Sequence, residues 1–362
     1  MHFQVGTAIH LKVRYFDPGA AKNTIRPDCP PTPMREKPGL SGAGISSYLL
    51  SRRLGLETRM SNSSNSPLPF DQLAEAIKSR RSDYGFISGL RLDRVARGEA
   101  WSSLPYRPIF IGDIKTGVLH GGVVTAMLDE SCGMAVQLAL DGTQAIATLD
   151  LRIDYQRPAT PGLDIKAHSI CYRVTRSIAF VRSTAFQEDE SDPVASATAC
   201  FMIGANRTNM MAEERMIDGI PPLLEAPEDP TGVFANSPFA RFLGIRAGDD
   251  DILVMPFSPQ LIGNPILPAI HGGLTGAFLE TTAIFGVTRE LGVAAMPKPI
   301  GLTINYLRSG RALDSHAKVS IVKQGRRIVA FEAQAWQDDA TKPIASAFGH
   351  FMLSKTPSMD EE

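Results

Sequence analysis

Two stretches of eleven residues decide how this chain is organised: Leu119-His-Gly-Gly-Val-Val-Thr-Ala-Met-Leu-Asp129 and Ile270-His-Gly-Gly-Leu-Thr-Gly-Ala-Phe-Leu-Glu280. In each stretch a carboxylate follows the histidine by nine residues. The second stretch repeats the first at a displacement of 151 positions. A repeat of this length is the first sign of a duplicated structural unit.

The same displacement holds far downstream. Leu151, Ile153 and Tyr155 recur 151 positions later, and after a one-residue gap the string that begins at Val194 aligns with the one that begins at Ile344. A register kept over this length indicates a tandem duplication. The expected parts are a first unit at 67–208, a linker at 209–235, a second unit at 236–354 and a C-terminal tail at 355–362.

Residues 1–66 stand outside the duplication. They are rich in proline and end in a run of serine and asparagine, so they bury too little apolar surface to offset their ordering entropy. We expect a disordered N-terminal extension. The alternative is a natural start at Met60, with residues 1–59 the product of an over-long gene assignment, and mass spectrometry of the native N-terminus distinguishes the two.

Composition excludes several classes of function. Among the 362 residues, 37 Lys and Arg balance 38 Asp and Glu, so there is no electrostatic argument for nucleic acid or an anionic membrane as partner. There is also no apolar run near the ~20 residues of a membrane span. The four cysteines are far apart and form no Cys-x-x-Cys pair, which favours neither a zinc site nor a disulfide framework. A reducing cytoplasm is the expected location.

Each unit shows the same order of patterns. A short helical stretch, 70–80 or 237–243, leads through a Pro-containing loop to a long helix, 121–140 or 272–291, and then to extended runs. These runs are predicted at 149–155, 165–174, 178–186 and 194–203, with repeats at 316–323, 327–337 and 343–353. A long helix followed by an antiparallel meander predicts an α+β fold in which the helix packs against the sheet.

The carboxylates that end the two repeated stretches suggest a catalytic site. Glycines at a helix start let a ligand approach the backbone, and the unpaired first-turn N–H groups there can hold a carbonyl oxygen or oxyanion. Asp129 and Glu280 follow about two turns later on apolar helices, among small neighbours that leave room for a substrate. Small residues also mark close helix packing, which is the structural alternative. Because charged residues are rarely buried unpaired, an acid kept in both copies favours a functional role.

These motifs resemble the hotdog-fold acyl-CoA thioesterases, specifically the phenylacetyl-CoA thioesterase (PaaI-like) group, marked by His-Gly-Gly with Asp or Glu nine residues on. The resemblance covers both units and implies a tandem (double) hotdog fold, each unit a long central helix wrapped by a curved antiparallel sheet. It implies that the sheets pair edge to edge, with active sites at the seam. By this resemblance Asp129 and Glu280 are catalytic, and the oxyanion or substrate-binding residues are His120, Gly121, Gly122, Asn264, His271, Gly272 and Gly273.

In that family the acid comes from the opposing unit, so two composite sites are expected. Asp129 would act with His271 and Gly272, and Glu280 with His120 and Gly121. Relatives also place an asparagine shortly before the histidine: Asn264 stands seven residues before His271, although about one residue from the family's spacing, whereas Asp113 holds the equivalent place before His120. A carboxylate there would repel an oxyanion, so we expect the Asp129 site to be the more active.

The expected function is hydrolysis of an acyl-CoA-type thioester to a carboxylic acid and free thiol. The helix carboxylate serves as base or nucleophile, and no metal or other cofactor is required. The partner is an acyl-CoA substrate, and a dimer of tandem chains is the expected homo-oligomer. Two alternatives remain open: a hotdog hydratase or dehydratase of enoyl or hydroxyacyl thioesters, and a non-catalytic acyl-CoA-binding sensor.

Overall fold

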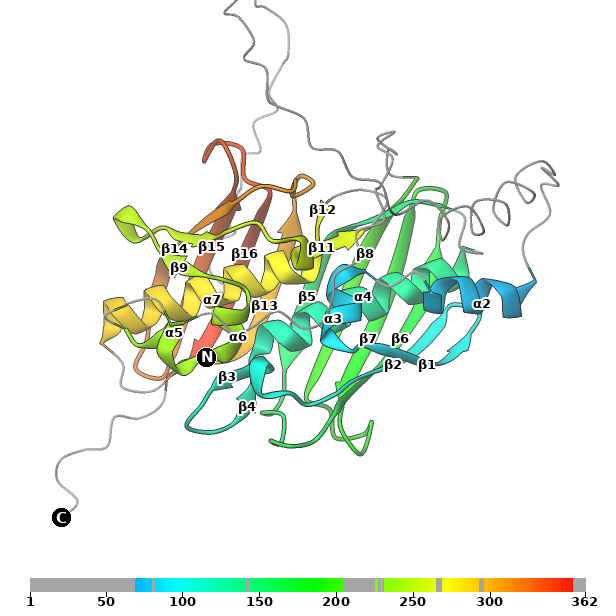
Figure 1. Cartoon of the computed structure of the whole chain (residues 1–362), viewed down its shortest axis with the longest axis horizontal. Coiled ribbons are helices and arrows are strands. Elements are labelled where there is room, and N and C mark those ends of the chain that lie inside the picture. The colour runs from blue at the N-terminus through cyan, green and yellow to red at the C-terminus, as the bar shows by residue number, and fades with distance from the viewer. Residues whose placement is uncertain are drawn as a thin grey trace, which may run out of the picture. The chain divides into compact units, whose positions relative to one another are not determined.

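The computed structural model describes residues 69–79, 82–140, 144–204, 225–226, 229, 231–264, 269–292 and 296–353 (Figure 1). The predicted extension 1–66, the alternative start at Met60, the tail 355–362 and most of the predicted linker 209–235 lie outside these residues. None of the helices in the described ranges is long and apolar enough to span a bilayer.

The helices are α2 (Phe70–Ser79), α3 (Asp83–Ser88), α4 (Gly121–Ala139), α5 (Val233–Asn236), α6 (Pro238–Phe242) and α7 (Gly272–Leu291), with 3-10 turns η1 (Pro108–Phe110), η2 (Asp249–Asp251) and η3 (Pro259–Leu261). The strands of the first half are β1 (Arg91–Ala96), β2 (Glu99–Leu104), β3 (Ile111–Asp113), β4 (Val118–Leu119), β5 (Ile146–Tyr155), β6 (Ile165–Val174), β7 (Ile178–Phe186) and β8 (Ala195–Ile203). Those of the second half are β9 (Arg246–Ala247), β10 (Leu253–Met255), β11 (Ile262–Asn264), β12 (Ala269–Ile270), β13 (Lys298–Tyr306), β14 (Ser315–Gln324), β15 (Ile328–Trp336) and β16 (Ala345–Met352).

Twelve strands form one sheet, in the order β1-β2-β6-β7-β8-β5-β13-β16-β15-β14-β10-β9. Read outward from the centre, the two halves have the same order, so the duplication in sequence is a duplication in topology. Neighbouring strands of this sheet pair antiparallel, as the meander of extended runs after each long helix predicts. The predicted α+β class is confirmed.

The two halves join where β5 pairs with β13. Leu151 lies opposite Ile304, and Ile153 lies opposite Leu302. Because Leu302 and Ile304 are the repeat counterparts of Leu151 and Ile153, the pairing is self-complementary in the manner of a two-fold interface. A contact from the first half to the second is therefore expected to recur between the repeat counterparts of its residues, with the two halves exchanged.

The long helices α4 and α7 lie across the same face of this sheet (Figure 1). Both are apolar nearly all round and are buried over most of their length, because each packs against its own half of the sheet and against the other helix. Each begins at the histidine of the repeated motif. His120 Nδ1 caps α4 by accepting the N–H of Gly122. In α7 the N–H of Gly273 faces two acceptors, His271 Nδ1 at 3.0 Å and Asp129 Oδ2 at 2.7 Å.

The structure corrects the predicted correspondence between the short helices that precede the two long helices. The stretches 70–80 and 237–243 were expected to correspond, but the counterpart of α6 is α3. Ser82 caps α3 and Ser237 caps α6 in the same way, and α3 contacts β11 of the second half while α6 contacts β3 of the first. Each half thus places a short helix beside the opposing motif.

Candidate functional site

The helices α4 and α7 cross in their N-terminal halves, where the first turn of each packs against the second turn of the other, and the second glycine of each motif makes this possible. A Cβ on Gly122 would lie 2.5 Å from the Ala277 Cβ, and one on Gly273 would lie 2.4 Å from the Ala126 Cα. Neither distance is tolerated by a real side chain. Part of the small-residue pattern therefore reflects close packing, which was the structural alternative considered above, and it brings each helix start beside the middle of the other helix.

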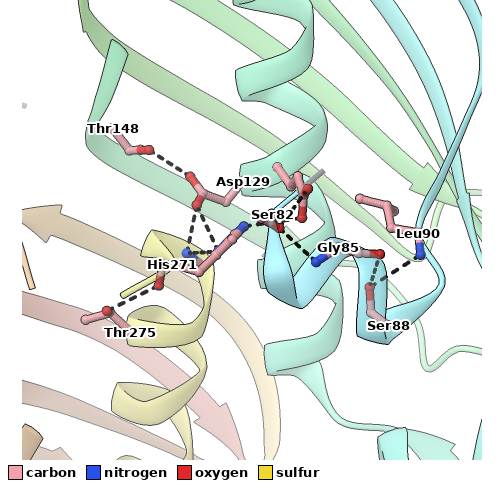
Figure 2. Close-up of polar contacts among 10 residues, drawn as sticks. Ser82, Gly85, Ser88, Leu90, Asp129, Thr148, His271 and Thr275 are labelled. Atoms are coloured by element: carbon pink, nitrogen blue, oxygen red, sulfur yellow. Dashed lines mark hydrogen bonds and ion pairs between the residues drawn. The ribbon is translucent and has the colours of Figure 1, made fainter. Parts of the chain in front are cut away.

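Asp129 lies at this crossing, against the first turn of α7 (Figure 2). Its Oδ2 accepts the N–H of Gly273 at 2.7 Å, and its Oδ1 accepts the hydroxyl of Thr148 at 2.9 Å. The side chain is 6% exposed. A Cβ on Gly272 would lie 2.9 Å from Oδ2, so only glycine fits comfortably here. The structure thus brings Asp129, His271 and Gly272 together, as expected, although the hydrogen bond goes to Gly273.

His271 is enclosed by two carboxylates from α4. Asp129 Oδ2 lies 3.5 Å from Nδ1, and Glu130 Oε2 lies 3.4 Å from Nε2. The ring of Tyr84 from α3 covers His271, with ring centroids 5.6 Å apart. Burial disfavours the imidazolium, but Glu130 and Asp129 outweigh it, so the pKa of His271 is raised above its ordinary value.

Glu280 occupies the mirror position, beside Gly121. Its Oε2 accepts the hydroxyl of Tyr155 at 2.9 Å, while Oε1 is buried with no hydrogen-bond partner among the described residues. A Cβ on Gly121 would meet Oε1, so the carboxyl fills the space that glycine leaves. The motif histidine of this site, His120, has Thr281 at Nε2 (3.4 Å) rather than an acid.

The two sites therefore differ in charge. Burial raises the pKa of Glu280 from 4.5 to about 8, offset only in part by the hydrogen bond from Tyr155. Burial lowers the pKa of His120 to about 4. The pKa of Asp129 is also raised, by burial and by the charge of Glu130, although His271, Thr148 and Gly273 all oppose the shift by stabilising the carboxylate. At neutral pH the second site holds a neutral acid beside a neutral imidazole.

This difference predicts how Glu280 affects stability. A carboxyl whose folded-state pKa is raised favours folding below pH 4.5, and that contribution is lost as pH rises through about 8. Gln imitates the protonated acid and cannot ionise. Glu280→Gln is expected to raise the free energy of unfolding relative to wild type by on the order of 5 kcal/mol at pH 9, and by little at pH 4.5.

Urea denaturation of both proteins at pH 4.5, 7 and 9 measures the effect. A difference that is constant across this range, or one that favours wild type at pH 9, would show that Glu280 ionises freely in the folded protein. Asp189→Asn, at a fully exposed carboxyl whose pKa local hydrogen bonds lower, serves as control because its effect on stability should not increase with pH.

The asymmetry expected from the residues that precede the two histidines stays a prediction. Asp113 lies at the end of β3, and its Oδ1 accepts the N–H of Lys115 at 3.0 Å within a tight turn. Asn264 lies at the end of β11, and its side chain is outside the described residues. A preference for the Asp129 site therefore rests on the surroundings of the two acids.

Several residues at the crossing were missed from sequence. They are Tyr84 and Glu130 beside His271, Ser82 beside Glu130, Thr148 beside Asp129, Tyr155 beside Glu280, and Tyr306, whose hydroxyl donates to the Gly272 carbonyl at 2.9 Å. Tyr155 and Tyr306 were visible as a repeated pair at strand ends. Glu130 had a weaker signal, since it directly follows Asp129 whereas Thr281 follows Glu280.

Two family profiles match the chain. The one described as "Thioesterase superfamily" matches residues 116–194, and the one described as "Acyl-CoA thioesterase N-terminal domain" matches residues 264–352. Each match contains one copy of the repeated motif with its acid, together with strands that follow it. The two halves are thus recognised separately.

Known proteins agree with these matches. The medium/long-chain acyl-CoA thioesterase YigI of Salmonella typhimurium is 32% identical over 129 residues, which cover 32% of this chain and 82% of YigI. A putative thioesterase from Novosphingobium aromaticivorans has a TM-score of 0.51 at 12% identity and covers 73% of this chain and 98% of that one. A protein with a hot dog fold from Alicyclobacillus acidocaldarius has a TM-score of 0.50 at 15% identity, covering 75% and 98%. At these identities the two structures show a shared fold.

Proposed function

Because this chain belongs to the hotdog-fold acyl-CoA thioesterases, we propose that it hydrolyses acyl-CoA at the composite site of Asp129 and the α7 N-terminus. Asp129 takes a proton from water as the water oxygen attacks the thioester carbonyl carbon. The carbon–sulfur bond then breaks, and the proton passes to the departing thiolate. The products are a carboxylic acid and free coenzyme A.

The observation that carries this proposal is the contact between Asp129 and the first turn of α7. Gly272 contributes the first N–H of that helix, which has no acceptor within the helix. An amide so placed polarises a carbonyl and stabilises the oxyanion formed on attack. The buried carboxylate lies beside it, so a base and an oxyanion donor come from opposite halves of the chain.

The hydrogen bonds of Asp129 favour activation of water over direct attack on the thioester. Both of its oxygens already accept a hydrogen bond, and attack through Oδ2 would break the one from Gly273. A single turnover in H₂¹⁸O distinguishes the routes. General base catalysis places ¹⁸O in the released acid, whereas ¹⁸O incorporated into Asp129 would identify a nucleophile.

YigI, as its name states, acts on medium- and long-chain acyl-CoA, and we propose the same substrate class here. Thiol release is expected to be faster from decanoyl-CoA and palmitoyl-CoA than from acetyl-CoA, by about tenfold or more in kcat/KM, because each buried methylene adds about 0.8 kcal/mol of binding. A thiol-release assay over acyl chains of increasing length measures this. A maximum at acetyl-CoA would contradict the proposed chain length.

The same substrates test the alternatives. Crotonyl-CoA that loses its double-bond absorbance without thiol release would indicate a hydratase. Tight binding of palmitoyl-CoA with no thiol release would indicate a sensor. Either result would overturn the proposed hydrolysis, whereas thiol release that depends on Asp129 supports it.

A further inference from the structure

Glu130 takes no part in the proposed hydrolysis, but its side chain is fixed beside His271. Its side chain is 9% exposed and faces the Nε2 of His271 at 3.4 Å, on the side of the ring opposite Asp129. The imidazole is itself 5% exposed. Three ionisable groups are thus gathered in a buried contact that α4 and α7 share.

The helix α3 is built to hold Glu130. The Ser82 hydroxyl donates to Glu130 Oε1 at 3.0 Å, while its oxygen caps α3 by accepting the N–H of Gly85 at 2.8 Å. A Cβ on Gly85 would lie 2.5 Å from Glu130 Oε1, so glycine leaves the space that the carboxylate occupies.

The second copy lacks the whole arrangement. Thr281 stands where the first copy has Glu130, and its hydroxyl donates to the Ala277 carbonyl at 2.8 Å. Ala240 on α6 stands where α3 has Gly85, and Phe239, which covers His120 with ring centroids 5.3 Å apart, stands where α3 has Tyr84. The acid and the space that admits it are present together in one copy and absent together in the other.

We propose that Glu130 is a positioning residue that holds the His271 imidazole as a cation beside Asp129, and that this cation keeps Asp129 a carboxylate. The proposal deepens the proposed function, because it rests on Asp129 as the base of the hydrolysis. It also gives a physical reason to expect different activities of the two composite sites at neutral pH.

The amide hydrogen bonds agree with this assignment. The N–H of Gly273 has Asp129 Oδ2 as its nearer acceptor, at 2.7 Å against 3.0 Å for His271 Nδ1, so this N–H keeps an acceptor when Nδ1 carries a proton. The N–H of Gly122 instead goes to His120 Nδ1 at 2.9 Å, which requires that nitrogen to be deprotonated.

The groups that face His271 leave few other sources of charge. From α4 these are Asp129 and Glu130, and from α3 it is Tyr84, whose pKa burial and Glu130 raise so that it stays neutral. Tyr306 of β13 lies near Asp129 and is also kept neutral by burial. The pKa shifts agree with these contacts: the pKa of His271 is raised, and that of His120 is lowered to about 4.

Glu130→Gln tests the proposal, with the rate of thiol release from palmitoyl-CoA measured from pH 5 to 10. Loss of the cation is expected to raise the pKa of Asp129 by more than removal of the Glu130 charge lowers it, because His271 has the larger influence on this carboxyl. The acid limb of the profile should therefore move to higher pH, by about one unit or more. Activity at pH 6 should fall at least about tenfold and approach that of wild type above pH 9. Equal loss at every pH, or an unmoved acid limb, would overturn the proposal.

NMR titration of the labelled histidine rings gives a readout that does not depend on turnover. The pKa of His271 should fall in Glu130→Gln and, in the same direction, in Gly85→Ala, which crowds Glu130 without removing it. If wild type releases no thiol, the proposed function fails, and this titration still decides the role of Glu130. An unchanged His271 titration in both variants would overturn it.

Glu99→Gln is the matched control. It removes another contact between a glutamate and a histidine, since Glu99 Oε2 lies 3.2 Å from His168 Nε2 on the strands β2 and β6, away from the site. Its acid limb and its His271 titration should match those of wild type. A shift equal to that of Glu130→Gln would mean that the effect is not specific to the site.

Discussion

Asp129→Asn is expected to lower kcat for thiol release by about 10²–10⁴, the range for removal of a general base. Asn keeps the shape of the side chain and can still accept the Thr148 hydroxyl. Its amide cannot take a proton from water, and an NH₂ group placed at Oδ2 would face the Gly273 N–H. A thiol-release assay under saturating palmitoyl-CoA measures the effect, and KM should change much less than kcat.

A charge-removing substitution outside the site gives the comparison. Asp154 is exposed on β5, where it pairs with Arg152, so Asp154→Asn should leave kcat within about twofold of wild type. Retention of activity by Asp129→Asn, with unchanged urea denaturation, would remove Asp129 from the mechanism.

Gly273→Ala is expected to produce a large loss of stability. The new Cβ would lie 2.4 Å from the Ala126 Cα, which is a backbone atom of α4 and cannot move aside as a flexible side chain would. Overpacking of this kind costs about 1–3 kcal/mol. Because the helices must separate to relieve it, the Gly273 N–H should also withdraw from Asp129, and thiol release should fall together with the free energy of unfolding.

Gly133→Ala is the matched control on α4. The atoms nearest to its new Cβ lie at 3.8 Å and 3.9 Å, which is ordinary contact, so the variant should be as stable as wild type or more stable by up to about 1 kcal/mol. Urea denaturation of both variants tests the helix crossing. Equal stability of Gly273→Ala and wild type would mean that α4 and α7 are not in close contact there.

Much of the fold could be predicted because the same sequence pattern occurs in both units. The starts of α4 and α7 were placed correctly, and the long strands agree within a few residues, since alternation and the two His-Gly-Gly motifs mark their ends. The resemblance to hotdog acyl-CoA thioesterases is confirmed by the family profiles and by YigI. Composite catalytic sites that draw on both halves stay a prediction from that resemblance; the structure places Asp129 beside Gly272 and Gly273, and Glu280 beside Gly121.

The surroundings of each acid could not be predicted, because they depend on contacts between distant segments. Ser82 reaches Glu130 across 48 positions, and nothing in the spacing shows that α3 lies beside the start of α7. Asp113 lies in a local turn, where its Oδ1 accepts the N–H of Lys115, and its effect on the site of Glu280 stays a prediction.

The central claim is that one of the two composite sites performs hydrolysis at neutral pH, and the ratio of kcat/KM between Glu280→Gln and Asp129→Asn at pH 7 tests it most directly. Glu280 is already protonated there, so Glu280→Gln should retain most of the wild-type value, and the ratio should exceed about 10². A ratio below one, with thiol release abolished only in Glu280→Gln, would contradict the claim.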